Sequence, residues 1–290
     1  MITVFTPSYN RGYIIHKLYE SLCRQSYTDF EWVVVDDGST DNTKELIQSF
    51  IAENKINMRY FYQRNAGKHV AINRGVQEAQ GELFFIVDSD DYLTVDALEK
   101  LSFHYKQIKD NDDFAGVSGT RITPEGNRIG GVLPFTALDC SIVDFGCFYG
   151  YIGDMSEAYK TEILRQYPFP QIEGEKFCPE SLVWNRIAQK HKLRYFNQGI
   201  YVCEYRPDGL TAKITRVRMQ SPIASMMHYA ELSKHPISVW QKVRAGINFW
   251  RFAACSDMQL REKVHMIDWS YCMFAPLGFI FHLKDNLSQR

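Results

Sequence analysis

The 290-residue sequence lacks the features by which several protein classes are recognised. Its seven cysteines are irregularly spaced and form no CxxC pair, which argues against a structural zinc site or a disulfide framework. No apolar run approaches the ~20 residues that span a bilayer, and the longest candidate, 271–281, contains Pro276 and Gly278. No GxGxxG follows the first apolar run, which disfavours a nicotinamide-dependent dehydrogenase.

A large net charge is also absent, because 33 Lys and Arg stand against 34 Asp and Glu. A chain with a net charge of −1 and no recognised reader module is not expected to bind nucleic acid. The charges are nevertheless unevenly placed, since residues 1–205 carry a net −7 and residues 206–263 a net +6. We therefore expect an anionic partner, such as a phosphate-rich surface, for the basic segment.

The amino terminus, Met-Ile-Thr-Val-Phe, reads directly into a strand pattern without the basic segment of a signal peptide. The irregular cysteine usage suits a reducing compartment. A cytoplasmic protein is therefore expected.

Strand and helix patterns alternate over the first 120 residues, which is typical of a parallel sheet covered by helices. We predict strands at 2–6, 32–35, 58–62, 83–87 and 115–118. We predict helices at 13–25, from an N-cap at Thr40 or Asp41 to about 52, at 68–80 with Gly81 as its C′ residue, and at 95–108. Beyond residue 120 we predict a loop over 121–150, a helix at 181–191, a strand at 200–205 and largely helical chain over 236–265.

Polar segments follow several predicted strands: 6–10, 36–37, 65–68 and 88–91. If the strand order is 3-2-1-4, these segments meet at one sheet edge, where α/β proteins bind ligands. At least five carboxylates would then repel one another unless a cation lay between them. Mg²⁺ or Mn²⁺, bound by one or two carboxylates together with a diphosphate, suits this arrangement better than a cage made of protein alone.

The residues in these segments resemble those of family 2 glycosyltransferases with the GT-A fold. The four motifs occur in the expected order: Thr-Pro-Ser-Tyr-Asn-Arg (6–11), Val-Val-Asp-Asp-Gly-Ser-Thr-Asp-Asn-Thr (34–43), Asn-Ala-Gly-Lys-His-Val-Ala-Ile-Asn-Arg-Gly (65–75) and Asp-Ser-Asp-Asp (88–91). The resemblance is close over 1–120 and looser over 174–180 and 204–211, where it is to bacterial enzymes that build capsular, O-antigen or exopolysaccharide chains. It implies an α/β, Rossmann-like, mostly parallel sheet sandwiched by helices.

The resemblance also implies a nucleotide pocket. Tyr9 offers a ring that can stack on uracil, and Asp37 matches the carboxylate that accepts the N3–H of uracil. Lys68 is placed to reach a diphosphate as a point charge. The structural alternatives are a turn residue that caps the next helix for Asp37 and a solvated first-turn residue for Lys68. The expected donor-binding residues are Thr6, Pro7, Tyr9, Asn10, Asp37, Asn65, Gly67, Lys68, Ser89 and Asp90.

Asp88-Ser89-Asp90-Asp91 matches the DXD motif, which in the family holds the metal that bridges the donor diphosphate. An N-cap for the following helix would need only one such residue, so three carboxylates in four positions favour metal binding. We expect Asp90 and Asp91 as the ligands, with Asp88 in reserve.

An inverting transfer needs a base that deprotonates the acceptor hydroxyl. Glu180 lies in a segment similar to the family's acidic motif, with Arg186 six residues later, although Pro179-Glu180 replaces the usual Glu-Asp pair. The structural alternative for Glu180 is a capping acid at a helix start. Further candidates for the base or the acceptor side are Glu175, Glu173, Arg206 and Asp208.

The domain prediction is one GT-A catalytic domain over 1–213, followed by a helical C-terminal extension over 214–290. The nucleotide-sugar-binding half of the catalytic domain ends at 120 and the acceptor-binding half begins at 121. In the extension, Val239, Val243, Ile247 and Trp250 form one helical stripe near basic residues, and 271–281 is apolar. These segments suit either a helix in the membrane interface or packing against the catalytic domain or a second subunit.

The sequence therefore predicts an inverting, metal-dependent glycosyltransferase that moves a sugar from a UDP-sugar to a saccharide or lipid-linked saccharide in polysaccharide biosynthesis. Location at the cytoplasmic face of the inner membrane and a homodimer are open possibilities. Two alternatives remain for the function. One is a sugar nucleotidyltransferase. Enzymes of that group typically have a glycine-rich loop after the first strand, whereas residues 7–10 of this chain contain no glycine. The other is a binding or assembly subunit of the same shape without turnover.

Overall fold

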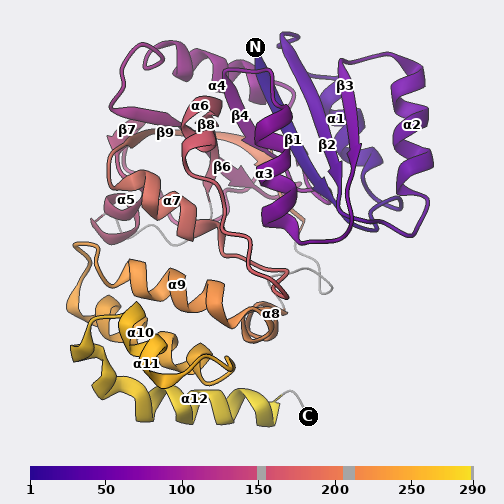
Figure 1. Cartoon of the computed structure of the whole chain (residues 1–290). Helices are drawn as coiled ribbons and strands as arrows, with labels where there is room; N and C mark the ends of the chain where they lie inside the picture. Colours follow the sequence, from indigo (N-terminus) through magenta and orange to yellow (C-terminus); the bar gives the residue numbers. More distant parts are fainter. Residues whose placement is uncertain (149–154, 205–212, 289–290) are drawn as a thin grey trace. The chain divides into compact units, whose positions relative to one another are not determined.

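The computed structural model describes residues 1–148, 155–204 and 213–288 (Figure 1). The chain divides into two compact units: Met1–Pro168 with Ile187–Tyr205, and Phe169–Arg186 with Arg206–Arg290. We call them the sheet unit and the helical unit. The predicted division between residues 213 and 214 stays a prediction, and the helical unit also takes in Phe169–Arg186.

The first half of the sheet is parallel. Its strands are β1 (Ile2–Ser8), β2 (Phe30–Asp36), β3 (Met58–Tyr62) and β4 (Leu83–Ile86). They pair in the order β3-β2-β1-β4, so the predicted order 3-2-1-4 is confirmed. Val4 in β1 lies between Trp32 in β2 and Phe85 in β4, and all three are fully buried, as parallel strands covered on both faces require.

The second half of the sheet is mixed. It contains β5 (Tyr92–Leu93), β6 (Phe114–Ile122), β7 (Ala137–Cys140), β8 (Met155–Lys160) and β9 (Lys192–Val202). β8 is antiparallel to β4 and β6, whereas β9 is parallel to β6 and antiparallel to β5 and β7. Two predictions were wrong here: 121–150 contains β7 and α5 (Ile142–Phe148), and β9 begins eight residues before 200. The first part of β9 contains polar residues, but it forms a strand because it pairs with β6 and β7.

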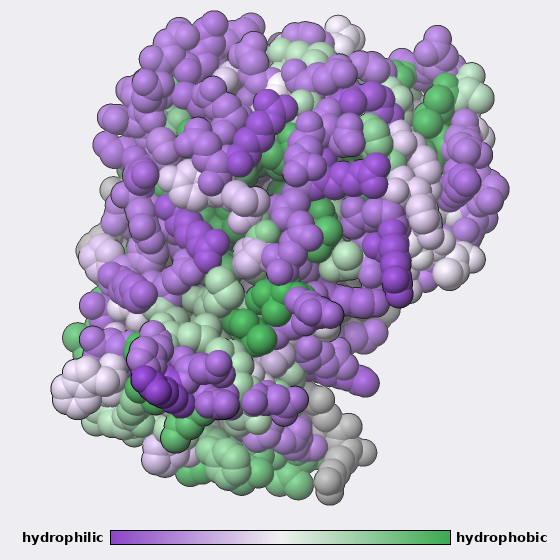
Figure 2. All heavy atoms as spheres, in the orientation of Figure 1, coloured by the Kyte–Doolittle hydropathy of each residue, from purple (hydrophilic) through white to green (hydrophobic). Residues whose placement is uncertain are grey.

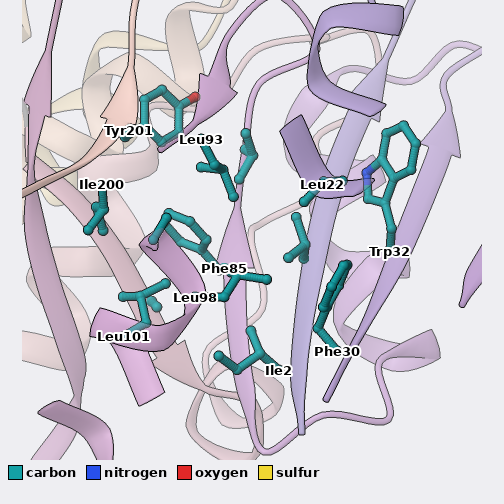
Figure 3. Packing of buried hydrophobic residues seen from close by; sticks show 14 of the residues in the cluster. Ile2, Leu22, Phe30, Trp32, Phe85, Leu93, Leu98, Leu101, Ile200 and Tyr201 are labelled. Atoms are coloured by element: carbon teal, nitrogen blue, oxygen red, sulfur yellow. The ribbon is translucent and has the colours of Figure 1, made fainter. Parts of the chain in front are cut away.

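Helices cover both faces of the parallel half: α1 (His16–Cys23), α2 (Thr43–Glu53), α3 (Lys68–Glu78), α4 (Ala97–Lys106) and, after β8, α6 (Thr161–Gln166). On one face, Leu22 of α1 and Leu98 and Leu101 of α4 join the main core with Trp32 and Phe85 (Figure 3). On the other face α3 lies so close to β1 that a Cβ at Gly75 would stand 2.1 Å from the Phe5 ring. This packing fixes the loops that follow each strand.

Two helix ends differ from the prediction. The N-cap residue of α2 is Asn42 rather than Thr40 or Asp41, although the Asp41 carboxylate still accepts the Thr43 backbone N–H at 3.1 Å. α3 ends at Glu78 with Ala79 as its C-cap, so Gly81 is not the C′ residue. Gly81 is needed for space, because a Cβ there would lie 2.4 Å from the Thr3 backbone nitrogen.

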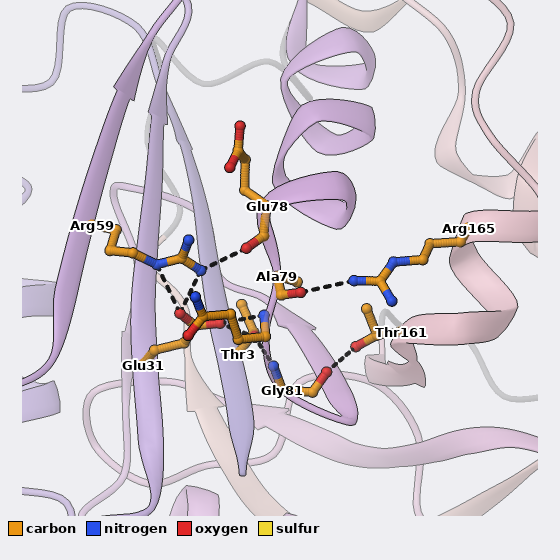
Figure 4. A network of polar contacts seen from close by, with 9 residues as sticks. Thr3, Glu31, Arg59, Glu78, Ala79, Gly81, Thr161 and Arg165 are labelled. Atoms are coloured by element: carbon orange, nitrogen blue, oxygen red, sulfur yellow. Dashed lines mark hydrogen bonds and ion pairs between the residues drawn. The ribbon is translucent and has the colours of Figure 1, made fainter.

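A network of hydrogen bonds and an ion pair connects the amino ends of the parallel strands (Figure 4). The fully buried Glu31 carboxylate accepts hydrogen bonds from the Thr3 hydroxyl at 2.6 Å and the Gln80 backbone N–H at 2.7 Å. Its other oxygen accepts from Nε and Nη2 of Arg59 at 3.0 and 2.6 Å. Every strong acceptor position of this buried charge is therefore satisfied.

The helical unit contains most of α7 (Glu180–Ala188), then α8 (Ile214–Gln220), α9 (Pro222–Leu232), α10 (Val239–Ala253), α11 (Leu260–Met266), η2 (Trp269–Phe274) and α12 (Ala275–Ser288). The predicted helical character of 236–265 is confirmed, with a break at 254–259. α10 buries Ala245, Phe249 and Trp250, while Val239 of the predicted stripe is 76% exposed. Of the other residues in the stripe, Val243 and Ile247 are half-buried and Trp250 is buried, and α10 packs against both α9 and α12.

Among the described residues, no single helix is long and apolar enough to cross a membrane. Leu260–Met266 and Trp269–Leu287 pass that test only as a pair, with a bend of 119° between them.

His228 makes the stability of the helical unit depend on pH. Burial, with a smaller contribution from Arg218, lowers the pKa of His228 from 6.5 to about 3. Between these values the unfolded chain binds one more proton than the folded chain, so stability falls as the pH falls from about 6.5 towards 3. The difference between the pKa values of His228 in the unfolded and folded chains corresponds to about 5 kcal/mol of unfolding free energy. We expect His228→Asn to remove this part of the pH dependence.

The measurement is chemical unfolding of wild type and His228→Asn between pH 4 and 8. The difference between their unfolding free energies should change by about 1.4 kcal/mol per pH unit below pH 6.5. Parallel curves would show that His228 is not buried in its neutral form.

Candidate functional site

Four loops meet at the carboxyl edge of the parallel strands. The Asp37 backbone N–H donates to the Ser8 carbonyl at 2.8 Å, which joins the ends of β2 and β1. The Gly67 N–H donates to the Asp37 carboxylate at 2.7 Å, and the Lys68 ammonium lies 2.5 Å from the Asp88 carboxylate. The segments 6–10, 36–40, 63–68 and 88–91 are therefore brought together, as the strand order predicts.

The loop after β1 presents an aromatic ring. Asn10 adopts a left-handed conformation with φ 53°, and its side-chain oxygen accepts the Thr40 backbone N–H at 2.8 Å. The Asn10 backbone N–H in turn donates to the Ser39 hydroxyl at 2.8 Å. This turn leaves the Tyr9 side chain 48% exposed, so its ring is available to a ligand.

Thr6 and Pro7 lie beneath this loop and are buried. The Thr6 hydroxyl accepts the indole N–H of Trp32 at 2.9 Å. This bond anchors the end of β1 to the core, so Thr6 supports the site from below.

Asp37 braces the loop that leads into α3. Its Oδ1 accepts from Gln63 Nε2 at 2.8 Å and from the Ala66 N–H at 2.9 Å, and its Oδ2 accepts from the Gly67 N–H. Each carboxylate oxygen has two lone pairs, so within the described part of the chain the contacts to Oδ2 leave one acceptor position. The structural alternative for Asp37, capping of the next helix, is not observed, because Asn42 is the N-cap of α2 and Asp37 instead holds the loop before α3.

Asn65 and Gly67 shape the same loop. The Asn65 side-chain amide donates to the Asp37 carbonyl at 2.9 Å. Gly67 has φ 101°, a conformation that residues with a side chain rarely adopt, and it is the N-cap residue of α3. The glycine lets the chain turn so that Lys68 reaches Asp88.

The acid turn, Asp88–Asp91, holds the carboxylates of Asp88 and Asp91 in different electrostatic surroundings. Burial acts to raise the pKa of Asp88, but Lys68, with Arg121 and Arg11 farther away, holds this pKa below its usual value. Burial and the charges of Asp88 and Asp90 raise the pKa of the Asp91 carboxyl from 3.8 to about 7. Asp88 is thus compensated by a lysine, whereas Asp91 lacks equivalent compensation.

The acid turn fits a hard divalent cation by its chemistry. Within the described residues no set of three or more His, Cys, Asp or Glu side chains forms a ready-made metal site. Mg²⁺ and Mn²⁺ do not require one when a diphosphate supplies the remaining oxygens. The Lys68 ammonium already forms an ion pair with the Asp88 carboxylate. The carboxylates suited to binding a cation are therefore those of Asp90 and Asp91.

Arg121 and Tyr201 adjoin the acid turn and were missed from the sequence. The Asp88 backbone N–H donates to the Tyr201 hydroxyl at 2.9 Å, and the Arg121 guanidinium lies 4.7 Å from the centre of the Tyr201 ring. Neither residue belongs to a local motif, since both come from strands far along the chain. Pairing of β6 with β9 brings them to the turn.

In the helical unit, the two candidate bases differ. Glu175 accepts the first backbone N–H groups of α9, from Ile223 at 2.6 Å and Ala224 at 2.9 Å. Burial raises the pKa of Glu175, and these two hydrogen bonds oppose the rise. Glu175 is therefore a helix cap. Glu180 is the first residue of α7, and Glu173 is exposed.

Arg186, six residues after Glu180, forms a two-pronged ion pair with Glu231 of α9 at 2.8 and 2.6 Å. It therefore joins α7 to α9. Arg206 and Asp208 lie outside the described residues.

The model of the family described as glycosyl transferase family 2 matches residues 3–159. The GalNAc(5)-diNAcBac-PP-undecaprenol beta-1,3-glucosyltransferase of Campylobacter jejuni is 27% identical over 217 residues, which cover 72% of this chain and 67% of that protein. Other curated glycosyltransferases align over as little as 26% of their own length, so the activities of those longer proteins do not transfer to this chain.

Two solved structures share the fold. S. aureus TarS 1–349 in complex with UDP-GlcNAc gives a TM-score of 0.66 at 18% identity, over 94% of this chain and 83% of TarS. The mannosyltransferase PcManGT from Pyrobaculum calidifontis, in complex with GDP-Man and Mn²⁺, gives 0.57 at 17% identity, over 98% and 87% of the two chains. The predicted GT-A fold with a helical C-terminal region is confirmed.

Proposed function

The chain belongs to glycosyl transferase family 2 and is a glycosyltransferase, and from this premise we propose that it transfers a sugar with inversion from a UDP-sugar to a saccharide or lipid-linked saccharide acceptor. A divalent cation assists the transfer, which serves the biosynthesis of a bacterial surface polysaccharide. The observation that carries the proposal is the meeting of Tyr9, Asp37 and the acid turn at one edge of the sheet.

The donor base binds between Tyr9 and Asp37. Tyr9 is half exposed and supplies a stacking surface, while the remaining lone pair of Asp37 Oδ2 accepts the N3–H of uracil. Asn10, Asn65 and Gly67 hold this pocket through the turns described above. The UDP-GlcNAc in TarS supports uracil, and the GDP-Man in PcManGT makes guanine the base to test against it.

Asp90 and Asp91 hold the cation together with the donor diphosphate, and Ser89 lies between Asp88 and Asp90 in the same turn. The cation, when bound, neutralises charge on the leaving diphosphate. Lys68 contributes a second positive charge at this edge, 2.5 Å from Asp88. The Mn²⁺ in PcManGT supports this assignment by analogy of fold.

Glu180 is the base that takes the proton from the acceptor hydroxyl, and Arg206 and Asp208 lie on the acceptor side. Glu180 is favoured over Glu175 because both Glu175 oxygens already accept backbone N–H groups of α9. The lipid-linked saccharide in the name of the Campylobacter relative supports an acceptor of that class.

We expect Asp90→Ala to lose metal-dependent donor binding, because one of two cation ligands is removed. The measurement is calorimetric titration of UDP, GDP, CDP and dTDP, each with and without Mn²⁺. Wild type should bind UDP tightly only with Mn²⁺, and Asp90→Ala at least tenfold more weakly. Asp110→Ala, at an exposed position, is the control. Unchanged UDP affinity in Asp90→Ala would remove Asp90 from the site.

We expect Glu180→Gln to keep UDP binding but to lose transfer by a factor of ~10² or more, because the amide cannot accept the proton. The measurement compares donor affinity and turnover in Glu180→Gln and Glu175→Gln. Glu175→Gln should lower thermal stability while keeping turnover in the folded fraction, since it weakens the cap of α9. The opposite pattern would assign the base to Glu175, and transfer by neither wild type nor variants would favour a binding subunit.

The partner of the helical unit is an anionic membrane surface that carries the acceptor. The α12 face consists of large apolar side chains that are 42–72% exposed: Leu277, Phe279, Ile280, Phe281, Leu283 and Leu287. Figure 2 shows hydrophobic atoms gathered over this helix. The side of α12 that contacts α10 is different, because a Cβ at Gly278 would lie 2.5 Å from Trp250 Cβ.

Exposed basic residues lie on the same unit: Arg244, Arg261 and Lys284. Apolar side chains that enter the interface beside cations that face lipid phosphates are typical of a peripheral membrane helix.

We expect Ile280→Glu/Leu287→Glu to lose binding to phosphatidylglycerol-containing vesicles at least tenfold in flotation, because two carboxylates would enter the interface. Val132→Glu, at a valine 90% exposed in the sheet unit, is the control. Flotation of the double variant at the wild-type level would refute the assignment. A wild-type dimer that the double variant converts to monomers, without flotation of either, would assign the α12 face to a second copy.

A further inference from the structure

One buried hydroxyl is bonded to the start of the acid turn. Tyr201 of β9 is 1% exposed, and its oxygen accepts the Asp88 backbone N–H at 2.9 Å. A phenol oxygen has lone pairs that accept hydrogen bonds. Tyr201 therefore fixes the backbone at the first residue of the turn from inside the sheet.

The Tyr201 ring is itself held on three sides. Its backbone lies opposite Leu93 of β5 and Arg121 of β6, so the residue sits inside the sheet rather than on a loop. The Phe85 ring of β4 packs edge-on against it, with 6.2 Å between the ring centres (Figure 3). The Arg121 guanidinium stacks at 4.7 Å from the ring centre. A hydroxyl on such a support keeps one position.

Arg121 is fixed in the same way. Its Nε donates to the Met155 carbonyl at 2.9 Å and to the Ser156 hydroxyl at 3.2 Å, at the start of β8. Burial disfavours its charge, but nearby groups that include Asp88 outweigh this effect and raise the pKa of Arg121. The sheet therefore places a permanent positive charge against the Tyr201 ring, close to the acid turn.

We propose that Tyr201, supported by Arg121 and Phe85, is a positioning residue that holds the Asp88–Asp91 turn in the geometry needed to bind a divalent cation together with a diphosphate. This inference rests on the proposed function. It adds that the cation ligands are oriented from within the sheet, by a residue more than 100 positions away in sequence, and not by the turn alone.

Tyr195 provides a matched comparison on the same strand. It is fully buried like Tyr201, but its hydroxyl has no hydrogen-bond partner among the described residues. Removal of the Tyr195 hydroxyl changes the packing of β9 as little as removal of the Tyr201 hydroxyl does, yet it breaks no contact to the acid turn. The pair separates positioning of the turn from general stability of the strand.

The experiment compares wild type, Tyr201→Phe and Tyr195→Phe by calorimetry with Mn²⁺ and UDP and by amide hydrogen exchange. We expect Tyr201→Phe to weaken Mn²⁺-dependent UDP binding about tenfold, since the hydrogen bond that holds the Asp88 backbone N–H is lost and the turn is no longer fixed at its first residue. The Asp88 amide should exchange faster in the same variant. Tyr195→Phe should match wild type in both measurements, and both variants should unfold within a few degrees of wild type.

Wild-type affinity and Asp88 exchange in a folded Tyr201→Phe would overturn the inference while the proposed function stands. Equal losses in both variants would also overturn it, because the effect would then come from strand packing. Failure of wild type to bind any nucleoside diphosphate with Mn²⁺ would overturn the proposed function and the inference with it. Arg121→Gln, which removes the charge against the ring, gives a second measurement if Tyr201→Phe does not fold.

Discussion

Carboxylates held within the fold at the two ends of the parallel strands, fully buried at Glu31 and half-buried at Asp88, are the constraint on which the sheet unit depends. At the amino ends, Glu31 receives four hydrogen bonds and the charge of Arg59, so its burial is fully compensated. At the carboxyl ends, Asp88 is paired with Lys68, whereas Asp91 is crowded by its neighbours. A buried carboxylate with its hydrogen bonds and ion pair formed is tolerated by the fold. A carboxylate close to other negative charges lowers the stability of the fold until a cation binds. The two ends of one sheet thus differ in what they can bind.

The parallel half of the sheet was predictable because its signals are local. Apolar runs such as Trp32–Val35 mark buried strands, and the polar residues that follow them mark the binding edge. The mixed half was not predictable in the same way. β9 carries Asn197 and Gln198 within its span, so periodicity alone reads its first part as a loop. Only its partners β6 and β7 make it a strand, and partners distant in sequence leave no periodic trace.

The same distinction holds for the site. The left-handed turn at Asn10 and the glycine before Lys68 each depend on a short run of consecutive residues, so sequence motifs predict them. Tyr201 and Arg121 approach the acid turn only because β6, β8 and β9 continue the sheet past β4. A tyrosine inside an apolar strand is indistinguishable in sequence from a core residue, and Tyr195 on the same strand is one. The role of such a tyrosine depends on the hydrogen-bond partner of its hydroxyl and not on the residue type.

Glu175 shows how a structural role can exclude a catalytic one. Burial raises its pKa, which by itself would make it a stronger proton acceptor. Protonation would, however, weaken the hydrogen bonds that Ile223 and Ala224 donate to it, and these hold the first turn of α9. Each catalytic cycle through Glu175 would therefore loosen the helix to which Arg186 anchors α7 through Glu231. Because the cap of α9 requires Glu175 to stay ionised, the cap and the base are best assigned to different glutamates.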